Sequence, residues 1–187
     1  MDFSALLEKR RSIRDFTGQD VPRDLILELM KESTLAPSSY NNQPWRFIVV
    51  RDRAFIKRIS DECKKNNLAR LEREPDSVLI RDRDDLLDEN YNVFYNAPVV
   101  VFVAGPAHAP SLDVDCALWA AYFMLAAVNR GLGTCWVGLG TNISDPALLA
   151  EMGLPDGFRI IAPIILGWPR TIPAPSERKV PEILKEI

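Results

Sequence analysis

The sequence predicts a mixed α/β sandwich, because helix-like and strand-like segments alternate along its 187 residues. Segments typical of strands are the apolar runs at 45–50, 99–104, 134–137 and 158–166. The segment 112–130 is apolar on every side, which is typical of a core helix. The length fits one domain, 1–187, with a substantial core and an extended tail from about residue 169. Spacing alone leaves the order of the strands open.

The composition is that of an ordinary globular protein, with 47% hydrophobic and 26% charged residues. A net charge of −3 and a sequence pI near 5.3 argue against nucleic-acid or acidic-membrane partners. The chain opens without a signal-peptide pattern, and its longest apolar run, 116–128, is too short for a membrane span. Three widely spaced cysteines without a CxxC pair favour a reducing cytoplasm.

The only histidine, His108, lies in a loop-like stretch before Ala109-Pro110. Zinc sites and Ser/His or Cys/His nucleophile systems would need this histidine, and its neighbours offer no ligand spacing. We therefore expect neither a metal site nor histidine-based catalysis. If the chain is an enzyme, the difficult chemistry is expected to belong to an organic cofactor.

Three helices and one buried strand are predicted in the first part of the chain. A short helix-like lead covers 3–9, and a longer helix opens at Pro22 and ends near 34–37. The strand at 45–50 follows. The third helix is expected from Asp52 to about Lys65.

The rest of the chain begins with a stretch, 61–92, in which nearly half the residues are charged. Mixed charges with apolar anchors between them predict exposed helices and a loop, and a mobile cover over a site is the alternative. After the strand at 99–104 comes the core helix, which Gly131 is expected to end in a left-handed cap. A short helix from Asp145-Pro146 and the last strand follow, and the proline-containing tail is expected to run extended.

The stretch Arg10-Arg11-Ser12-Ile13-Arg14 places three guanidiniums and a hydroxyl in five residues. In an extended chain, Arg10, Ser12 and Arg14 share one face, and Arg11 points to the other. A guanidinium binds phosphate oxygens two at a time, and a serine hydroxyl adds a neutral donor. The stretch therefore predicts a site for a mononucleotide phosphate, with a solvated charged segment as the alternative and an interface role open for Arg11.

Two further stretches carry polar or backbone groups suited to a ligand. Residues 37–44 hold no charge and are crowded with hydrogen-bonding side chains, which suits a polyol or the edge of a heterocycle. The alternative is a plain turn between a helix and a strand. Gly138 and Gly140 would let a flat ligand lie against backbone N–H groups. This is no dinucleotide fingerprint, because Gly131-x-Gly133 follows a helix and nothing matches GxGxxG.

Together these stretches resemble the FMN-dependent nitroreductase family in its short single-domain form. The motifs, in the family's order, are 10–14, 36–45, 94–98 and 131–138. The match spans nearly the whole chain, and 61–92 is its least constrained part. The resemblance implies an α+β fold, an α/β sandwich with a mostly antiparallel central sheet flanked by helices. It also implies an intertwined homodimer with two FMN molecules at the subunit interface.

The resemblance further implies which residues hold FMN. The phosphate and ribityl chain would be held by Arg10, Arg11, Ser12 and Arg14. The isoalloxazine ring would be lined by Trp136, Val137, Gly138 and Leu139. The FMN of the other subunit would be contacted by Pro37, Ser38, Ser39 and Asn41. In the tail, Arg178 resembles the basic element that returns to the phosphate, with Lys179 as the alternative.

By the same resemblance, NADH or NADPH would reduce FMN, and a nitroaromatic, a quinone or a similar small acceptor would then take the electrons in a ping-pong cycle. Tyr40 would line the acceptor cavity, or else pack at the dimer interface. Two alternatives stay open: a flavin-binding sensor or storage protein without turnover, and a specialised family branch that removes halogen or destroys flavin.

Overall fold

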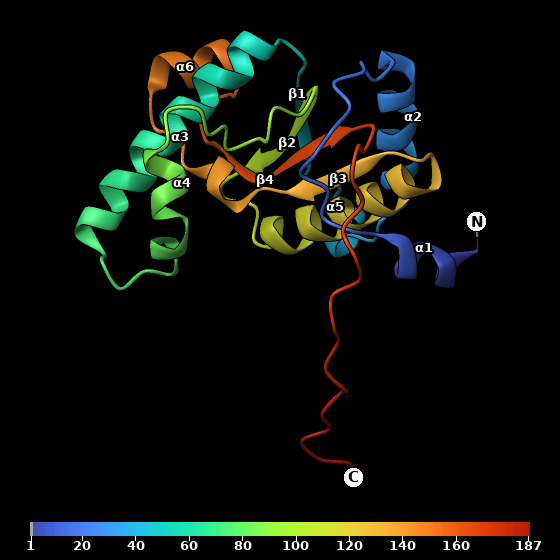
Figure 1. Cartoon of the computed structure of the whole chain (residues 1–187). Helices are drawn as coiled ribbons and strands as arrows, with labels where there is room; N and C mark the ends of the chain where they lie inside the picture. The colour runs from blue at the N-terminus through green and yellow to red at the C-terminus, as the bar shows by residue number, and fades with distance from the viewer. Residues whose placement is uncertain (1) are drawn as a thin grey trace.

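A four-stranded antiparallel sheet with helices on both faces forms the body of the protein (Figure 1). The computed structural model describes residues 2–187. In the order β1-β2-β4-β3, the strands are Arg46–Val50, Val99–Pro106, Phe158–Gly167 and Gly133–Trp136. The helices α1 to α6 span Phe3–Lys9, Arg23–Ser33, Arg53–Arg73, Arg83–Leu87, Leu112–Asn129 and Pro146–Met152. The short 3₁₀ helices η1 to η3 span Ser39–Asn41, Val78–Asp82 and Gly138–Thr141. The predicted α+β class and the antiparallel sheet are confirmed.

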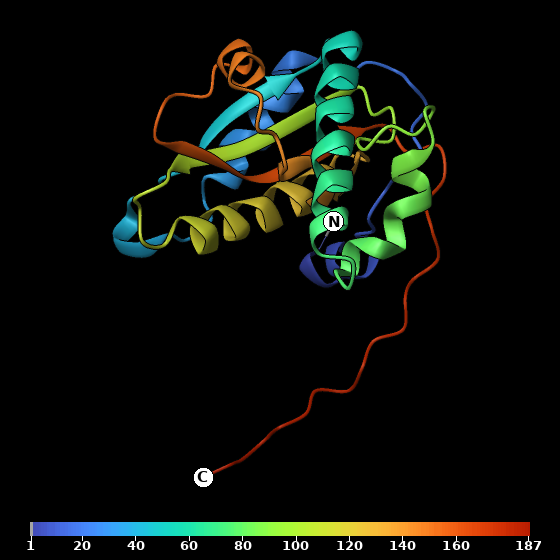
Figure 2. The ribbon, with the colours of Figure 1, turned by 90° about the vertical axis from the view of Figure 1, so that its left-hand side faces the viewer.

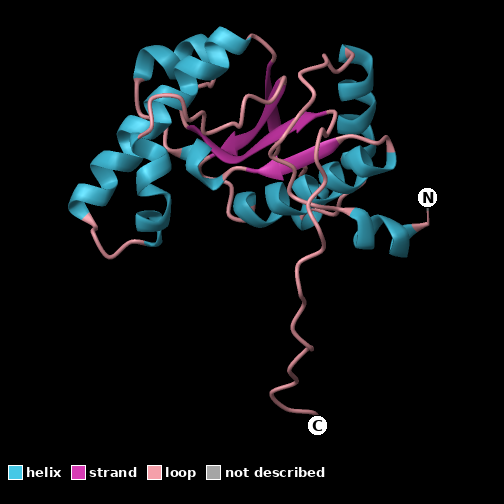
Figure 3. Cartoon of the chain, in the orientation of Figure 1, coloured by secondary structure: helices cyan, strands magenta, loops and turns pink. Residues whose placement is uncertain are grey.

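Strand β2 joins two cores, one on each face of the sheet. Val101 and Val103 face the core shared with α2 and α5, whereas Val100 and Phe102 face the core shared with α3 and α6. Side chains alternate between the two faces of a strand, so one apolar run supplies both cores. Figure 2 shows α3 crossing in front of the sheet, and Figure 3 shows the strands as one layer between helices.

Helix α5 is the predicted core helix. Its buried stripe includes Trp119 and Phe123, whose rings stack with centroids 4.9 Å apart. Gly131 adopts the expected left-handed backbone, with φ of 74°, just after the helix. Within residues 2–187, α5 is the one helix long and apolar enough to cross a membrane, and its packing on the sheet is that of a core helix.

Two predicted elements differ in detail from the structure. The strand at 45–50 was expected to be buried, but β1 lies at the edge of the sheet, and Val50 is its only buried residue. Helix α3 continues beyond its expected end near Lys65, because Asn67 and Leu71 extend its buried face to the last turns.

Of the charged stretch 61–92, the part from residue 74 on forms the predicted exposed helices and a loop, whereas 61–73 belong to α3 and bury Cys63, Lys64, Asn67 and Leu71. Leu86 and Val93 are buried and anchor the segment, whereas Val78 and Leu87 remain exposed. Whether this segment moves as a cover stays a prediction.

The C-terminal tail leaves the body soon after β4. The Thr17 N–H donates to the Trp168 carbonyl, and the Arg170 N–H donates to the Asp15 carbonyl. These bonds tie the start of the tail to the N-terminal segment. Residues 171–187 form no helix or strand, and Figure 1 shows them leading away from the body.

Candidate functional site

The arginine-rich segment is extended, as predicted, and lies beside β3. Ser12 forms a parallel bridge with Thr134, and the Ile13 N–H donates to the Thr134 carbonyl at 2.9 Å. Ile13 is buried against Gly133, where a Cβ would lie 2.6 Å from the Ile13 side chain. The close approach requires this glycine. With Ile13 turned inward, Arg14 is exposed on the outer side of the segment.

Arg14 and the segment 136–139 line one hollow of about 270 Å³. Its remaining lining residues are Leu79, Asp82, Tyr95 and Cys135. The structure thus places Arg14, which is predicted to hold the phosphate or the ribityl chain, beside the predicted ring-binding segment of the same chain. Leu79 and Asp82 belong to η2, so the charged stretch 61–92 does shape this cavity.

The two glycines expected to admit a flat ligand have different environments. A Cβ on Gly138 would meet no atom within 4 Å, so this glycine opens the wall of the hollow. A Cβ on Gly140 would lie 2.6 Å from the buried Phe94 ring. Gly138 fits the predicted role, whereas Gly140 is required by the core.

Backbone donors remain available in the same wall. Among residues 2–187, the N–H groups of Gly138 and Leu139 have no hydrogen-bond acceptor, whereas the Val137 N–H donates to the Pro163 carbonyl. The buried Asn67 side chain on α3 donates to the Leu139 carbonyl at 2.9 Å. The turn is therefore fixed from behind, and its free N–H groups suit the heteroatoms of a flat ring.

The guanidinium of Arg14 lies 5.6 Å from the centroid of the Tyr95 ring, within cation–π range. Tyr95 has a left-handed backbone, with φ of 53°. Burial, together with a hydrogen bond to Tyr95, raises the pKa of Tyr91 above its usual range. The Tyr91 ring packs edge-on against the Tyr95 ring, with centroids 5.8 Å apart, and so supports the ring that lies beside Arg14.

A second hollow, of about 350 Å³, shares Arg14 and Tyr95 with the first. Its polar lining adds a second guanidinium and three amides, from Arg170, Asn90, Asn92 and Asn96. The Arg170 guanidinium also lies 3.8 Å from the Asp15 carboxylate. Asp15 lines the hollow as well, and each amide offers an acceptor oxygen beside its NH₂ group, so the mixed lining suits a polyol, with the two guanidiniums available to an anion.

Arg11 lies on the other side of the segment from Arg14, as its alternation predicts. It lines a separate hollow of about 500 Å³ near α1, Val128 and Pro173. Its Nη1 donates to the Arg10 carbonyl at 2.7 Å, and its buried Nε has no partner within residues 2–187. Arg10 lines none of these three hollows. Their predicted roles in holding phosphate stay predictions.

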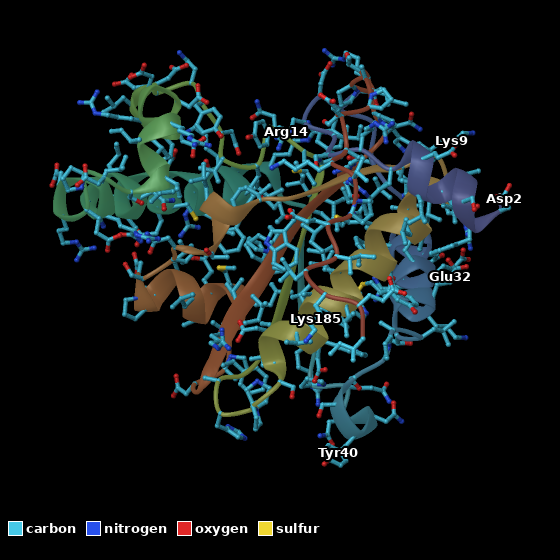
Figure 4. All side chains as sticks on the ribbon, turned by 90° about the horizontal axis from the view of Figure 1, so that it is seen from below. Asp2, Lys9, Arg14, Glu32, Tyr40 and Lys185 are labelled. Atoms are coloured by element: carbon cyan, nitrogen blue, oxygen red, sulfur yellow. The ribbon has the colours of Figure 1, made fainter. Side chains whose placement is uncertain are left out.

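The polar loop lies on the opposite side of the molecule from Arg14. Figure 4 shows Arg14 and Tyr40 at opposite ends of the molecule. The Tyr40 side chain is 96% exposed. Within one chain, therefore, neither Tyr40 nor its neighbours Pro37, Ser38, Ser39 and Asn41 reach the hollow, and their predicted contacts require a second copy.

Arg178 and Lys179 are exposed in the tail, which leads away from the body in Figure 1. The structure does not bring them to Arg14 within one chain. Their return to a phosphate stays a prediction.

Sequence reasoning missed two buried polar residues that hold parts of the predicted site: Asn67 binds the Leu139 carbonyl, and Asp115 binds the Ser39 N–H. Asn67 occupies the buried face of α3, four residues after Cys63, and Asp115 occupies the buried face of α5, four residues before Trp119. A polar side chain at helical spacing within an apolar stripe requires a hydrogen-bond partner, which is the signal that could have identified both.

Among residues 2–187, no three His, Cys, Asp or Glu side chains are placed to hold a metal ion. The three cysteines are buried and unpaired, and burial raises the pKa of Cys63 and Cys116 to about 12. Cys63 and Cys116 are therefore poor nucleophiles. The polar groups that the hollows offer to a ligand include guanidiniums, amides and backbone N–H donors.

Residues 7–168 match the model of the nitroreductase family. A putative NADH dehydrogenase/NAD(P)H nitroreductase of Archaeoglobus fulgidus is 26% identical over 88% of this chain and 84% of its own. A 5,6-dimethylbenzimidazole synthase of Rhodospirillum rubrum is 28% identical over 96% of this chain and 85% of its own. Iodotyrosine deiodinase 1 of Rattus norvegicus is 24% identical over 100% of this chain and 70% of its own.

The fold is also shared with solved structures. A nitroreductase from Bacteroides fragilis, solved with bound FMN, superposes with a TM-score of 0.81 at 23% identity. The match covers 100% of this chain and 99% of that one.

Proposed function

The chain belongs to the nitroreductase family, and from this premise we propose that it is an FMN-dependent oxidoreductase that acts as a homodimer. NADH or NADPH supplies the electrons, and a nitroaromatic, a quinone or a similar small molecule accepts them. The observation that carries the proposal is the hollow that Arg14 shares with residues 136–139, where Gly138 leaves the wall open.

The residues present fit FMN. Gly138 leaves room for a flat ring, and the free N–H groups of Gly138 and Leu139 can donate to ring heteroatoms. The adjoining polar hollow, with Arg14 and Arg170, suits a polyol and its phosphate. When bound, FMN supplies the redox chemistry, by accepting a hydride and passing the electrons on.

The chain's own contribution is binding and orientation. Arg14 is supported by the Tyr95 ring and supplies a fixed positive charge beside the hollow. Asn67 holds the Leu139 carbonyl, so the two neighbouring N–H groups are kept in place. Preorganised donors of this kind are effective because they need no reorganisation when charge develops on the ligand.

An exposed apolar stripe supports the homodimer. Val114, Leu118 and Tyr122 follow one another at one-turn spacing along α5, and all three are exposed. The tail carries further exposed apolar side chains, including Val180 and Leu184. Contiguous apolar surface marks interaction sites, and a two-fold pairing would cover the same stripe on both copies.

A second copy would also complete the site. The polar loop is too far from Arg14 of its own chain to contact the same ligand (Figure 4). In the proposed dimer, the loop of one protomer closes the hollow of its partner, and Arg178 or Lys179 reaches the phosphate. Tyr40 then either borders the acceptor or packs at the interface, and both roles need the second copy.

One alternative keeps the cofactor and changes the chemistry. The synthase and the deiodinase that this chain resembles favour a specialised branch that destroys flavin or removes halogen. The other alternative is a flavin-binding sensor or storage protein without turnover. The buried, unpaired cysteines are compatible with the reducing cytoplasm in which we place the protein.

The test is a flavin titration followed by steady-state kinetics. We expect purified protein to bind FMN and to oxidise NADH or NADPH when a nitroaromatic or a quinone is added. FMN binding without turnover of any acceptor would favour the sensor. Loss of flavin absorbance in air with the nicotinamide donor, or halide release from a halotyrosine, would favour a specialised branch. Absence of FMN binding would overturn the proposal.

A further inference from the structure

The polar loop is held by a buried carboxylate that lies outside the recognised motifs. Asp115, in the first turn of α5, is only 3% exposed. One of its oxygens accepts a hydrogen bond from the backbone N–H of Ser39 at 2.9 Å. The N-terminal end of a long helix stabilises a negative charge at this place. The carboxylate therefore ties the loop to the core helix.

The loop needs such an anchor because its backbone is strained. Tyr40, Asn41 and Gln43 have φ angles of 50°, 55° and 45°, which lie in the left-handed region. This region is unfavourable for residues other than glycine, and such residues remain there only where surrounding contacts fix them. The hydrogen bond to Asp115 joins Ser39 to the core helix, and at the other end of the turn the exposed Arg46 side chain donates to the Gln43 carbonyl at 3.2 Å.

Hydrogen bonds inside the loop decide which groups it presents. The side-chain amide of Gln43 donates to Asn41 Oδ1 at 3.0 Å, which leaves the Asn41 NH₂ group for an outside partner. Ser38 Oγ accepts from the Gln43 N–H at 3.0 Å, so its own hydrogen is free to be donated. The loop thus presents mainly donors, which suit oxygen and nitrogen acceptors on a ligand.

We propose that Asp115 is a positioning residue, which holds the loop in the donor-presenting shape that the partner's flavin site requires. This inference rests on the proposed function, because the FMN and the second copy belong to it. Asp115 touches no ligand and acts through Ser39. Without this anchor the left-handed residues relax, which weakens flavin binding and raises KM for the acceptor, while kcat of the flavin-saturated enzyme changes little.

The experiment compares three variants of the full-length protein with the wild type. Asp115→Ala removes the anchor, and Asp115→Asn keeps an oxygen that can accept from Ser39. Asp113→Ala is the matched control, because Asp113 lies one half-turn away on α5 and pairs with Arg159 of β4 at 2.8 Å. Hydrogen exchange of the 39–43 amides is measured on protein without flavin. The FMN dissociation constant comes from fluorescence quenching.

We expect Asp115→Ala to expose the loop amides to exchange and to raise the FMN dissociation constant about tenfold, as for loss of a charge-assisted hydrogen bond. Asp115→Asn should restore most of both properties, and Asp113→Ala should match the wild type in both. If the loop amides of Asp115→Ala exchanged at the wild-type rate, Asp115 would not anchor the loop. Wild-type FMN affinity despite faster loop exchange would overturn its role in the flavin site, and so would equal losses in the Asp113 control.

A second variant covers the case in which Asp115→Ala does not fold. Ser39→Pro removes the donor N–H and leaves the carboxylate in place, and the extended backbone of Ser38, with φ of −143° and ψ of 155°, allows a following proline. It should show the same faster exchange at 40–43 and the same loss of FMN affinity, and wild-type values would count against the anchor. If the wild type binds no FMN, the proposed function fails, and with it the role assigned to Asp115 in the flavin site.

Discussion

The two predicted halves of the flavin site differ in what holds them in place. The half around Arg14 and 136–139 rests on the core, because Ile13 packs on Gly133 and Asn67 holds the Leu139 carbonyl. The polar loop rests on its own internal hydrogen bonds, on the Asp115 carboxylate and on one hydrogen bond from the exposed Arg46 side chain. Arg14 and residues 136–139 meet in one hollow of a single chain, whereas Tyr40 lies on the opposite side of the molecule from Arg14. The difference supports a site divided between two copies.

The largest effect is expected from breaking the pairing that joins the halves. Leu118→Asp places a charge in the middle of the exposed stripe on α5, where a partner would have to desolvate it. We expect monomers on light scattering, and an FMN dissociation constant raised by about a hundredfold or more. Leu27→Asp, on the exposed side of α2, is the control and should remain a flavin-binding dimer. A monomeric Leu118→Asp protein with full flavin content would contradict the divided site.

Sequence reasoning named residues of both halves, and within one chain the structure brings together only part of the first. The fold class could be predicted because apolar runs mark buried strands. The run 99–104, for example, forms most of β2, and its side chains enter the cores on both faces of the sheet. β1 was placed correctly but taken as buried, because a strand's position at a sheet edge depends on pairing partners that no local pattern encodes. Arg14 and residues 136–139 were identified through motifs, and the structure brings them to one hollow.

Other features of the site depend on tertiary contacts. Leu79 and Asp82 of η2 line the hollow, and their mixed-charge segment has no pattern that predicts this. Gly138 and Gly140 look equivalent in the sequence, and only the position of the Phe94 ring separates their roles. Asp115 could be recognised as a polar residue in an apolar stripe, but not as the partner of Ser39.

The next largest effect is expected at Gly138, which should differ from Gly140 in its role within the half of the site around Arg14 and 136–139. Gly138→Val fills space that no other atom occupies, so we expect unchanged thermal stability and an FMN dissociation constant raised about thirtyfold by crowding of the ring. Gly140→Ala is the matched control, because its Cβ would meet the buried Phe94 ring and should cost roughly 1–3 kcal/mol of folding free energy. Denaturant unfolding and flavin titration measure the two properties. Equal flavin affinity in Gly138→Val and the wild type would show that the flavin ring does not lie against Gly138.

A smaller effect is expected from the charges of the arginine-rich segment. Arg14→Ala removes a guanidinium from both hollows, and a charge-assisted hydrogen bond of about 1.5–3 kcal/mol predicts roughly tenfold weaker FMN binding. Arg11→Ala is the comparison, because Arg11 faces a different hollow, near α1. Arg11→Ala should raise the FMN dissociation constant less than Arg14→Ala does. It should also weaken self-association if the face of the segment that carries Arg11 lies at the dimer interface. Isothermal titration with FMN gives the first value and sedimentation the second. A larger flavin loss in the Arg11 variant would reverse the assignment of the two faces.

The smallest effect is expected from substitution of Tyr40, at the exposed tip of the polar loop. Tyr40 is 96% exposed, so its side chain contributes almost nothing to the stability of its own chain. If the loop closes the partner's site and Tyr40 stacks on the acceptor, Tyr40→Ala should raise the acceptor KM about threefold, the scale of a single aromatic contact. Flavin affinity should not change, because the donors at Ser38 and Asn41 remain. If Tyr40 instead packs between subunits, KM stays constant and the dimer dissociates at a higher protein concentration. Acceptor KM and sedimentation, measured on the same variant, separate the two roles, and no change in either would place Tyr40 outside both the acceptor site and the interface.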